Sequence, residues 1–301
     1  METLTGNGIR PVPTAHYEDQ DVCPGPQYLR IADMNDAGAL LASDMDGTVI
    51  PLEEDPRRAE ELAAFRMAVE GAPELTLAYV TGRDLPLALR GIRRHGLPEP
   101  DILVCDVGTS VYHATPGGFE KDQEYVRLME EARGGLDVRE VRHEMGRVSQ
   151  LLLQPEDRQT ESKLSYHLAP DSDHTEVLGS VKEVLDGLGG RIQAVYSVGA
   201  PSGRGLLDLL PAGVAKDYAI RYLHDHTGVH PDHLIYAGDS GNDLAAMLTG
   251  FKVIVVGNAT PGLREELTDR AGEMGILDRL DFAEGFYAAG VLEGCRHFGV
   301  F

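Results

Sequence analysis

The chain has 301 residues, of which 42% are hydrophobic and 25% are charged, and its formal net charge is −22. This composition is typical of a globular protein with a sizeable core, and the acidic excess disfavours nucleic acids and anionic membranes as partners because both are polyanions. No apolar run approaches the ~20 residues of a membrane-spanning helix, and the N-terminus lacks the basic and apolar regions of a signal peptide. The three cysteines are scattered without metal-binding spacing, so we expect a protein of the reducing cytoplasm. We also expect a monomer or a homodimer.

Residues 1–36 contain several prolines among polar residues without periodicity, so we expect a loosely ordered N-terminal arm. From about residue 37 onward, apolar strand-like runs alternate with helical segments. The expected strands cover 39–43, 75–80, 101–106, 234–237 and 251–257, and the expected helices cover 57–70, 85–95, 215–227 and 285–298. This alternation predicts an α/β fold with a Rossmann-like parallel sheet and right-handed crossovers.

The pattern changes in the middle of the chain. We expect residues 113–118 to form a turn-rich linker. The strand-like segments that follow cover 150–154, 163–168, 191–198 and 205–210, and an amphipathic helix covers 177–188. We therefore predict a small α+β domain at 116–205 that is inserted into a core made of 37–115 and 206–301.

Polar residues directly follow the first two core strands. Asp44 and Asp46 come after the first strand, and at a strand end residues i and i+2 point to the same side. Two carboxylates held this close repel each other unless a proton or a cation lies between them. Thr81 and Gly82 follow the second strand, where Thr81 taken alone is more simply explained as the cap of the next helix.

Two further polar signals lie in the second half of the chain. Lys216 begins a predicted helix, and Asp239 and Asp243 follow the strand at 234–237. Taken alone, Lys216 would be a solvated surface lysine and Asp243 a helix N-cap. The carboxyl ends of parallel strands meet at one edge of a sheet, however, so the aspartates can converge there. Their oxygen ligands suit Mg²⁺ far better than zinc.

In order, these signals resemble the four motifs of the haloacid dehalogenase superfamily of phosphatases and phosphotransferases. Asp44–Thr48 is similar to its D-x-D-G-T motif, and Thr81–Arg83 is similar to its second motif. Lys216 resembles the third motif and Gly238–Asp243 the fourth. The resemblance covers the chain from about residue 39 to 298, and the inserted domain is placed like the larger caps of this superfamily, which close over the site and choose the substrate.

The resemblance implies a role for each acidic residue. Asp44 would attack phosphorus to give an aspartyl-phosphate. Asp46 would protonate the leaving alkoxide and then deprotonate the water that cleaves the acyl phosphate. Mg²⁺ would be held by Asp44, the backbone carbonyl of Asp46 and Asp239, with Asp243 close by through water. The intact Asp46 is typical of alcohol leaving groups rather than of dehalogenation.

The resemblance also implies a phosphate-binding set made of Thr81, the backbone N–H of Gly82, Lys216 and Asn242. Thr81 and Gly82 would hold phosphate oxygens. Lys216 would offset the negative charge on the nucleophile and on the transferring phosphoryl group.

Finer features resemble the sucrose-phosphatase branch of the superfamily, which implies a sugar or glycosyl phosphate as substrate. These features are the segments 107–112, 154–166, 207–211 and 290–298. In the second segment, Gln159, Glu161 and Lys163 could bind sugar hydroxyls, with Lys163 as the best candidate, and the alternative is a solvated hairpin turn. Asp84 departs from the asparagine that is more usual in this branch.

Other functions share the same core residues. They are a broad-specificity phosphatase, a phosphatase for mannosylfructose or glucosylglycerol phosphate, and a phosphomutase-type phosphotransferase. A protein that only binds a phosphosugar would be expected to lack Asp44 or Asp46, and both are present. The sequence therefore predicts a Mg²⁺-dependent phosphomonoesterase for a small-molecule sugar phosphate.

Overall fold

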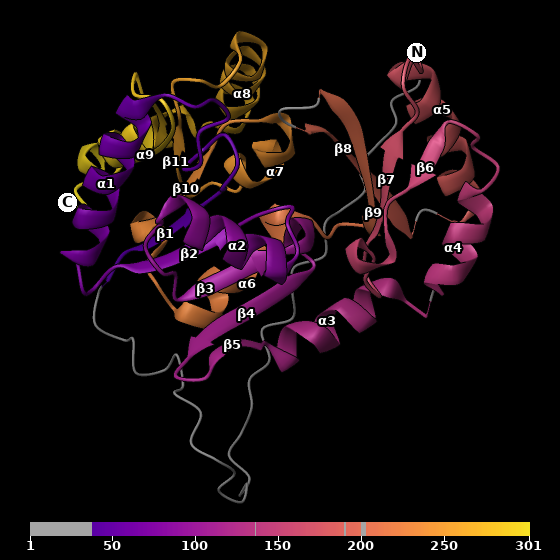
Figure 1. Ribbon diagram of the computed structural model, residues 1–301, viewed down its shortest axis with the longest axis horizontal. Coiled ribbons are helices and arrows are strands. Elements are labelled where there is room, and N and C mark those ends of the chain that lie inside the picture. The colour runs from indigo at the N-terminus through magenta and orange to yellow at the C-terminus, as the bar shows by residue number, and fades with distance from the viewer. Residues whose placement is uncertain (1–37, 136, 190, 200–202) are drawn as a thin grey trace, which may run out of the picture.

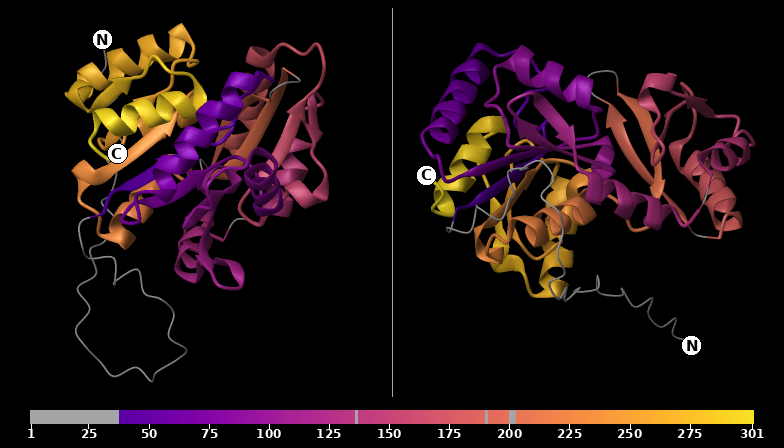
Figure 2. Two further views of the ribbon diagram at one scale, coloured as in Figure 1. Left: turned by 60° about the vertical axis from the view of Figure 1, so that its left-hand side comes forward. Right: turned by 90° about the horizontal axis from the view of Figure 1, so that it is seen from below.

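The structure, a computed structural model, describes residues 38–301 except 136, 190 and 200–202, so the predicted N-terminal arm at 1–36 lies outside it. The described chain forms two lobes, each built on its own sheet (Figures 1 and 2). Among the described residues, no helix combines the length and the apolar character needed to cross a bilayer.

The larger sheet carries the core strands. Its members are β1 (Leu40–Ser43), β2 (Thr76–Val80), β3 (Ile102–Cys105), β4 (Ser110–Thr115), β5 (Gly118–Lys121), β10 (Leu234–Gly238), β11 (Lys252–Val255) and β12 (Leu280–Phe282). They follow the order β12-β11-β10-β1-β2-β3-β4-β5. Because β1 pairs in parallel with β10 on one side and with β2 on the other, the carboxyl ends of these three strands meet at the centre of one edge. The predicted Rossmann-like α/β fold is confirmed.

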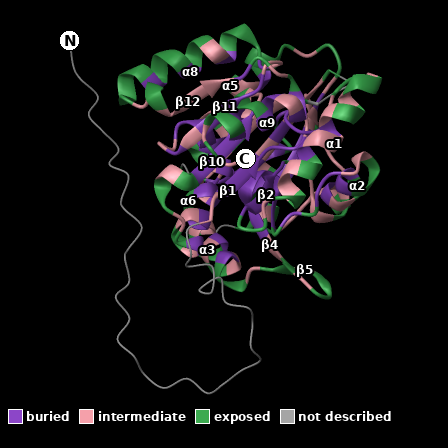
Figure 3. Cartoon of the chain, turned by 90° about the vertical axis from the view of Figure 1, so that its left-hand side faces the viewer, coloured by how far each residue is buried: buried purple, intermediate pink, exposed green. Residues whose placement is uncertain are grey.

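Helices cover both faces of this sheet. One face packs on α1 (Pro56–Glu70), α2 (Leu85–His95) and α9 (Tyr287–His297), and the other on α3 (Gln123–Arg133), α6 (Lys216–Thr227), α7 (Leu244–Met247) and α8 (Pro261–Met274). Figure 3 shows the central strands buried and the outer helix surfaces exposed. Because both faces are covered, every residue of β1 and β2 is buried, which explains why their sequences are apolar apart from Ser43 and Thr76.

Residues 113–118, expected to be a turn-rich linker, instead belong to a hairpin at the sheet edge. β4 pairs antiparallel with β3, and β5 pairs antiparallel with β4. Pro116 and Gly117 form the turn between the two strands, which suits the fixed φ of proline and the conformational freedom of glycine. The residues of β5 are exposed or only partly buried, so they are polar and do not show an apolar strand pattern.

Helix α8 and strand β12 also lie outside the elements that the sequence predicted. The buried side of α8 consists only of Leu263, Leu267 and Ala271. Thr260 caps this helix and Pro261 occupies its first turn, both of which are common start signals. Three buried apolar residues over about four turns give too weak a periodicity to stand out from the surrounding charges.

The smaller sheet is antiparallel and belongs to the inserted domain. Its strands are β6 (Leu151–Leu153), β7 (Leu164–Leu168), β8 (Ile192–Gly199) and β9 (Arg204–Pro211), in the order β6-β7-β9-β8. One face packs on α4 (Val138–Met145) and α5 (His174–Gly187) through a separate apolar cluster. Leu164, Tyr166 and Leu168 point into that cluster, so the alternate residues Ser165 and His167 lie on the opposite face.

The strand pairings show where the chain passes between the sheets. β5 still belongs to the larger sheet, and β9 belongs to the smaller one. The expected boundaries at 115/116 and 205/206 therefore fall inside the β4–β5 hairpin and inside β9. We propose that the chain crosses between the core and the inserted domain at Asp122 and at residues 212–215. We call these two crossing points the first and the second passage. The side chain of Gln193 on β8 ties the second passage to the smaller sheet, because its Nε2 donates to the Val214 carbonyl at 2.7 Å and its Oε1 accepts from the Gly213 N–H at 3.2 Å.

Asp122 fixes the first passage. One carboxylate oxygen accepts from the backbone N–H groups of Glu124 and Tyr125 at the start of α3, each at 2.9 Å. The other oxygen accepts from the Tyr222 hydroxyl at 2.7 Å and lies 2.7 Å from His113 Nε2. Burial alone would raise the pKa of Asp122, but these hydrogen bonds outweigh it and hold the pKa well below its usual range.

Asp122→Asn should destabilise the folded protein by about 1–3 kcal/mol at pH 7, because hydrogen bonds to a largely buried carboxylate are lost. A carboxyl whose pKa is lowered on folding stabilises the fold above its unfolded pKa of about 4 and loses that contribution as the pH falls through the folded value. The free energy of unfolding, measured in urea, should therefore differ less between wild type and variant below about pH 4 than at pH 7. An equal difference at pH 3 and pH 7 would contradict this role.

Candidate active site

The turn after β1 places the first two aspartates. The backbone N–H of Asp44 donates to the Ala237 carbonyl at 2.9 Å, so the chain leaves β1 beside β10 with the Asp44 side chain buried. Gly47 has φ of +83°, a left-handed conformation that glycine adopts readily. A Cβ at Gly47 would also lie only 2.4 Å from Asp239 Oδ2. Glycine is therefore required both for the turn and for the close approach of Asp239.

Lys216, the first residue of α6, is buried between two carboxylates. Its Nζ lies 2.9 Å from Asp44 Oδ1 and 2.7 Å from Asp243 Oδ1, and it donates to Asn242 Oδ1 at 3.4 Å. Burial alone would lower the pKa of Lys216, but the two carboxylates raise it above its usual value, so Lys216 is an ammonium. The alternative interpretation of Lys216 as a solvated surface lysine is therefore wrong.

Asp243 organises the loop after β10. Besides contacting Lys216, its Oδ1 accepts from the Tyr236 hydroxyl at 2.6 Å. Its Oδ2 accepts from the backbone N–H groups of Ser240 and Asp239 at 3.1 and 3.2 Å. Asp243 does occupy the N-cap position of α7, as the alternative interpretation held, but its side chain makes no capping bond to that helix. Asp243 thus holds both Lys216 and the segment that carries Asp239.

Three carboxylates converge at this edge of the sheet. Asp44, Asp239 and Asp243 each offer an oxygen within 4.8 Å of the others, and Asp239 Oδ1 accepts from the Thr48 hydroxyl at 2.9 Å. Burial and the charge of Asp243 raise the pKa of Asp239 to about 7. Burial also raises the pKa of Asp44, against the opposing effect of Lys216. A cluster of oxygen donors that resist ionisation together fits a hard divalent cation such as Mg²⁺.

The phosphate-binding residues expected after β2 lie at the same edge. Thr81 is buried, its N–H donates to the Val104 carbonyl at 2.8 Å, and its hydroxyl accepts from the Arg83 N–H at 3.2 Å. The N-cap of α2 is Asp84, whose carboxylate accepts from the Leu87 N–H at 2.8 Å. The alternative interpretation of Thr81 as the cap of this helix is therefore wrong.

Asp46 lies apart from the three clustered carboxylates. Arg83 donates through Nε and Nη2 to its two carboxylate oxygens, at 2.7 and 2.5 Å. Arg83 belongs to the segment that resembles the second motif, but the sequence alone indicates no role for it. Asn258 was also missed, and it donates to the Gly47 carbonyl at 2.7 Å and accepts from the Tyr287 N–H at 3.0 Å. Its position shortly after a parallel strand, β11, is the signal that could have identified it.

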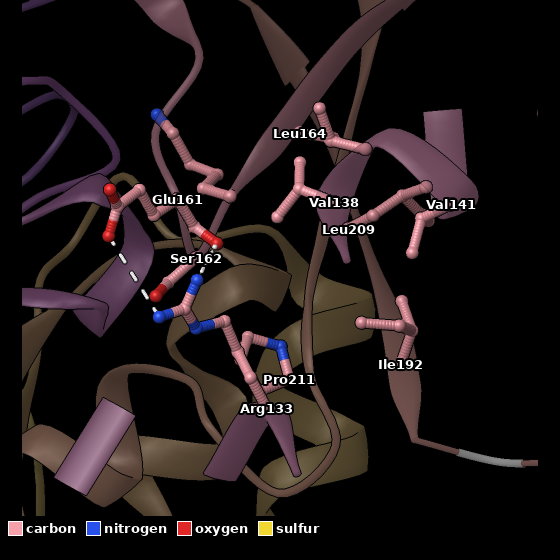
Figure 4. A pocket seen from close by; sticks show the side chains of 10 residues that line it. Arg133, Val138, Val141, Glu161, Ser162, Leu164, Ile192, Leu209 and Pro211 are labelled. Atoms are coloured by element: carbon pink, nitrogen blue, oxygen red, sulfur yellow. Dashed lines mark hydrogen bonds and ion pairs between the residues drawn. The ribbon is translucent and has the colours of Figure 1, made fainter. Parts of the chain in front are cut away.

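Two of the expected sugar-binding residues have local partners. The Gln159 amide donates to the Gln154 and Ser165 carbonyls at 2.9 and 3.1 Å and accepts from the Ser165 N–H at 2.7 Å, so it shapes its own hairpin. The Glu161 side chain is 87% exposed, and its carboxylate lies 3.9 Å from Arg133 Nη2. Figure 4 shows Glu161 and Arg133 at a pocket with an apolar wall. Its volume of about 20 Å³ holds about one water molecule, so it is too small for a sugar.

Lys163 differs from these two residues because it reaches the core. Its Nζ lies 2.8 Å from Asp106 Oδ1, and both side chains are buried. The alternative interpretation of a solvated turn is therefore wrong for Lys163. Nearby, the Ser165 hydroxyl donates to Asp208 Oδ1 at 2.5 Å, and burial raises the pKa of Asp208. Asp208 lies in the segment 207–211, which was noted in the sequence without a role for this residue.

A buried carboxylate that shares an ammonium with a second aspartate is suited to phosphoryl transfer, and the surrounding sheet has the haloacid dehalogenase fold. The protein is a phosphoric monoester hydrolase of this class. Residues 37–299 match the family described as Sucrose-6F-phosphate phosphohydrolase, and the chain belongs to that family.

Known proteins similar to the chain cover most of its length. A HAD-like hydrolase of Nitrosococcus oceani is 33% identical over 86% of this chain and 71% of the relative. The mannosylfructose-phosphate phosphatase of Agrobacterium fabrum is 30% identical over 87% of this chain and 97% of the relative. The crystal structure of the sucrose-phosphatase of Synechocystis, in complex with sucrose and phosphate, matches with a TM-score of 0.72 and 30% identity, covering 87% of this chain and 98% of that chain.

Gly47→Ala should lower kcat/KM for phosphate release by about a hundredfold, because Asp239 has to move away from the new Cβ and small misplacements at a reacting centre have effects of this size. Gly250→Ala is the matched control. Gly250 has φ of +92°, and its Cβ would meet no atom within 4 Å. It should therefore share the loss of thermal stability but keep its activity. Similar activities of the two variants would contradict the role of Gly47.

Proposed function

We propose that the protein is a Mg²⁺-dependent phosphatase that hydrolyses a sugar or glycosyl phosphate through an aspartyl-phosphate on Asp44, and that it acts in the cytoplasm. The observation that carries the proposal is the buried contact of 2.9 Å between Asp44 Oδ1 and Lys216 Nζ, beside Asp239 at the carboxyl edge of the sheet. The relatives named for mannosylfructose phosphate and sucrose support a glycosyl phosphate as the substrate class.

In the first half-reaction, a carboxylate oxygen of Asp44 forms a bond to phosphorus while the bond from phosphorus to the sugar oxygen breaks. Asp46 gives a proton to the leaving oxygen, so the sugar departs as a neutral alcohol. The Lys216 ammonium offsets the negative charge that is shared between Asp44 and the phosphoryl oxygens. Thr81 and the Gly82 N–H orient the phosphoryl group, and Asn242 helps to keep Lys216 in place.

In the second half-reaction, Asp46 accepts a proton from a water molecule as the water oxygen attacks phosphorus. The bond between phosphorus and the Asp44 oxygen breaks, which releases inorganic phosphate and restores the Asp44 carboxylate. The same side chain therefore serves as the acid in one step and as the base in the next, and each step returns it to the state that the other requires.

The clustered carboxylates are the groups that would hold Mg²⁺. We assign direct contacts to Asp44, Asp239 and the backbone carbonyl of Asp46. Both oxygens of Asp243 already accept hydrogen bonds or contact Lys216, so we assign Asp243 to orienting the site. When bound, Mg²⁺ supplies positive charge beside the transferring phosphoryl group.

The inserted domain is the proposed source of substrate choice, because the core contacts address only the phosphate. Lys163, Ser165 and Asp208 form a polar group on or beside the face of the smaller sheet that is turned away from α4 and α5. Donors and acceptors of this kind suit sugar hydroxyls. We keep Lys163 as the proposed sugar contact, and we assign Gln159 and Glu161 to the hairpin that carries it.

The proposed substrate class is tested by phosphate release from a panel in Mg²⁺. The panel contains sucrose 6-phosphate, mannosylfructose phosphate, glucosylglycerol phosphate, trehalose 6-phosphate and 4-nitrophenyl phosphate. One glycosyl phosphate should exceed 4-nitrophenyl phosphate in kcat/KM by at least about a hundredfold, because polar groups built for hydroxyls are left unpaired by a substrate that lacks them. Equal rates across the panel would indicate a broad-specificity phosphatase, and phosphate returned to a sugar would indicate a phosphotransferase.

Asp44→Asn should abolish turnover, since an amide cannot form the acyl phosphate.

EDTA should reversibly suppress phosphate release by the wild type, and added Mg²⁺ should restore it. Mg²⁺ should also raise the melting temperature of the wild type more than that of Asp239→Asn, which gives a readout that does not depend on activity. Full activity in metal-free protein would disprove the metal requirement.

A further inference from the structure

Arg83 has no role in the proposed mechanism, although its side chain contacts Asp46. Its two donor nitrogens bind both oxygens of the Asp46 carboxylate at 2.7 and 2.5 Å, which is the two-point geometry that arginine forms with carboxylates. The Asp46 side chain is 43% exposed, so without this contact it could turn into solvent. Arg83 therefore fixes the direction of the side chain to which both proton transfers are assigned.

The guanidinium of Arg83 is held in turn by α2. Its Nη1 donates to the Leu87 carbonyl at 3.3 Å. A Cβ at Gly91 would lie 2.1 Å from Nη1, so the guanidinium lies directly on the helix where no side chain projects. Arg83 thus connects α2 to Asp46. The position of the Arg83 guanidinium also depends on the backbone of Arg83 itself.

The backbone of Arg83 is held by the turn that follows β3. The Asp106 N–H donates to the Arg83 carbonyl at 2.9 Å, and the Val107 N–H donates to the Thr81 carbonyl at 3.1 Å. Asp106 and Val107 have φ of +55° and +60°, which is a strained backbone for residues other than glycine, above all for a β-branched one. Such a turn persists only where its surroundings hold it.

Two cations of the inserted domain contact acidic residues in or beside the loop that carries Arg83, which is the segment Thr81–Asp84 after β2. Lys163 pairs with Asp106 at 2.8 Å, where the two side chains are only 4% and 3% exposed. Arg158 pairs with Asp84, which directly follows Arg83 in the sequence. Both pairs therefore cross from the inserted domain to the core, and both end on a residue bonded to Arg83 or adjacent to it.

We propose that Arg83 is a positioning residue for Asp46, and that Arg158 and Lys163 of the inserted domain align Arg83 through Asp84 and Asp106. This inference rests on the proposed function. Withdrawing the inserted domain would separate Lys163 from Asp106 and Arg158 from Asp84, so the strained turn and the loop Thr81–Asp84 would lose two of the contacts that hold them. Proton transfer by Asp46 is thereby linked to closure of the inserted domain on the core.

Two aryl esters test the role of Arg83 without any sugar contact. Phenyl phosphate and 4-nitrophenyl phosphate share one ring and carry no hydroxyls, but the phenolate leaving group needs a proton much more than 4-nitrophenolate does. Arg83→Gln should lower the ratio of kcat/KM for phenyl over 4-nitrophenyl phosphate by about ten- to a hundredfold. Arg83→Lys should give an intermediate ratio, because an ammonium replaces the two-point contact with one point charge.

The same ratio tests the contribution of the inserted domain. Arg158→Gln and Lys163→Met should each lower it about three- to tenfold, since each removes one of two supports of the loop. Arg142→Gln is the matched control, because Arg142 pairs with Glu156 at 2.7 Å within the inserted domain. This control should keep the wild-type ratio. The melting temperature of each variant shows whether it folds. If Arg83→Gln does not fold, Arg83→Lys is used in its place.

Each outcome decides one part of the inference. Equal losses on both esters, or no loss, in the Arg83 variants would overturn its role toward Asp46. A selective loss in these variants with unchanged ratios in Arg158→Gln and Lys163→Met would overturn the link to the inserted domain. A wild type that is inactive on every phosphate monoester would instead overturn the proposed function, and this inference with it.

Discussion

The buried ammonium of Lys216 is the interaction on which the site depends. Parallel strands bring Asp44, Asp239 and Asp243 to one edge of the sheet, and carboxylates this close would repel one another without a cation. Lys216 contacts two of the three, and Asp243 then fixes the loop that carries the third. The cluster holds three carboxylates and one ammonium. A further cation would therefore be needed to offset the negative charge before a phosphate group binds.

Much of the core could be predicted from the sequence because its strands are buried on both faces. β1 and β2 are continuous apolar runs that end in polar residues, and that pattern indicates both the parallel sheet and the position of the site. The β4–β5 hairpin and α8 escaped prediction for the opposite reason. Their exposed sides are polar, and the few buried residues give little periodicity.

The contacts around the site were harder to predict than the residues that make them. Asp44 and Lys216 follow from their motifs, but Arg83 and Asp46 are 37 residues apart, and Arg158 and Asp84 are 74 apart. Nothing local in the sequence says which acid an arginine will meet, because the partner of Arg83 is set by how the ends of β1 and β2 lie side by side, and the partner of Arg158 by how the inserted domain packs on the core. A polar side chain in a hairpin is equally ambiguous, since it can bind a ligand or, as Gln159 does, its own backbone.

The bonds between Gln193 and the second passage limit how the inserted domain of this protein can be exchanged. Gln193 binds the backbone of both Gly213 and Val214, while the Val214 side chain packs in the apolar cluster of the larger sheet, and Lys216 follows only two residues later. Ala215 between them has an extended backbone with φ of −149° and ψ of −162°. A chimaera that takes its inserted domain from a relative should therefore be joined after position 214. A joint at the end of β9 would separate Gln193 from its partners and attach the buried lysine to a strand end that was not built to place it.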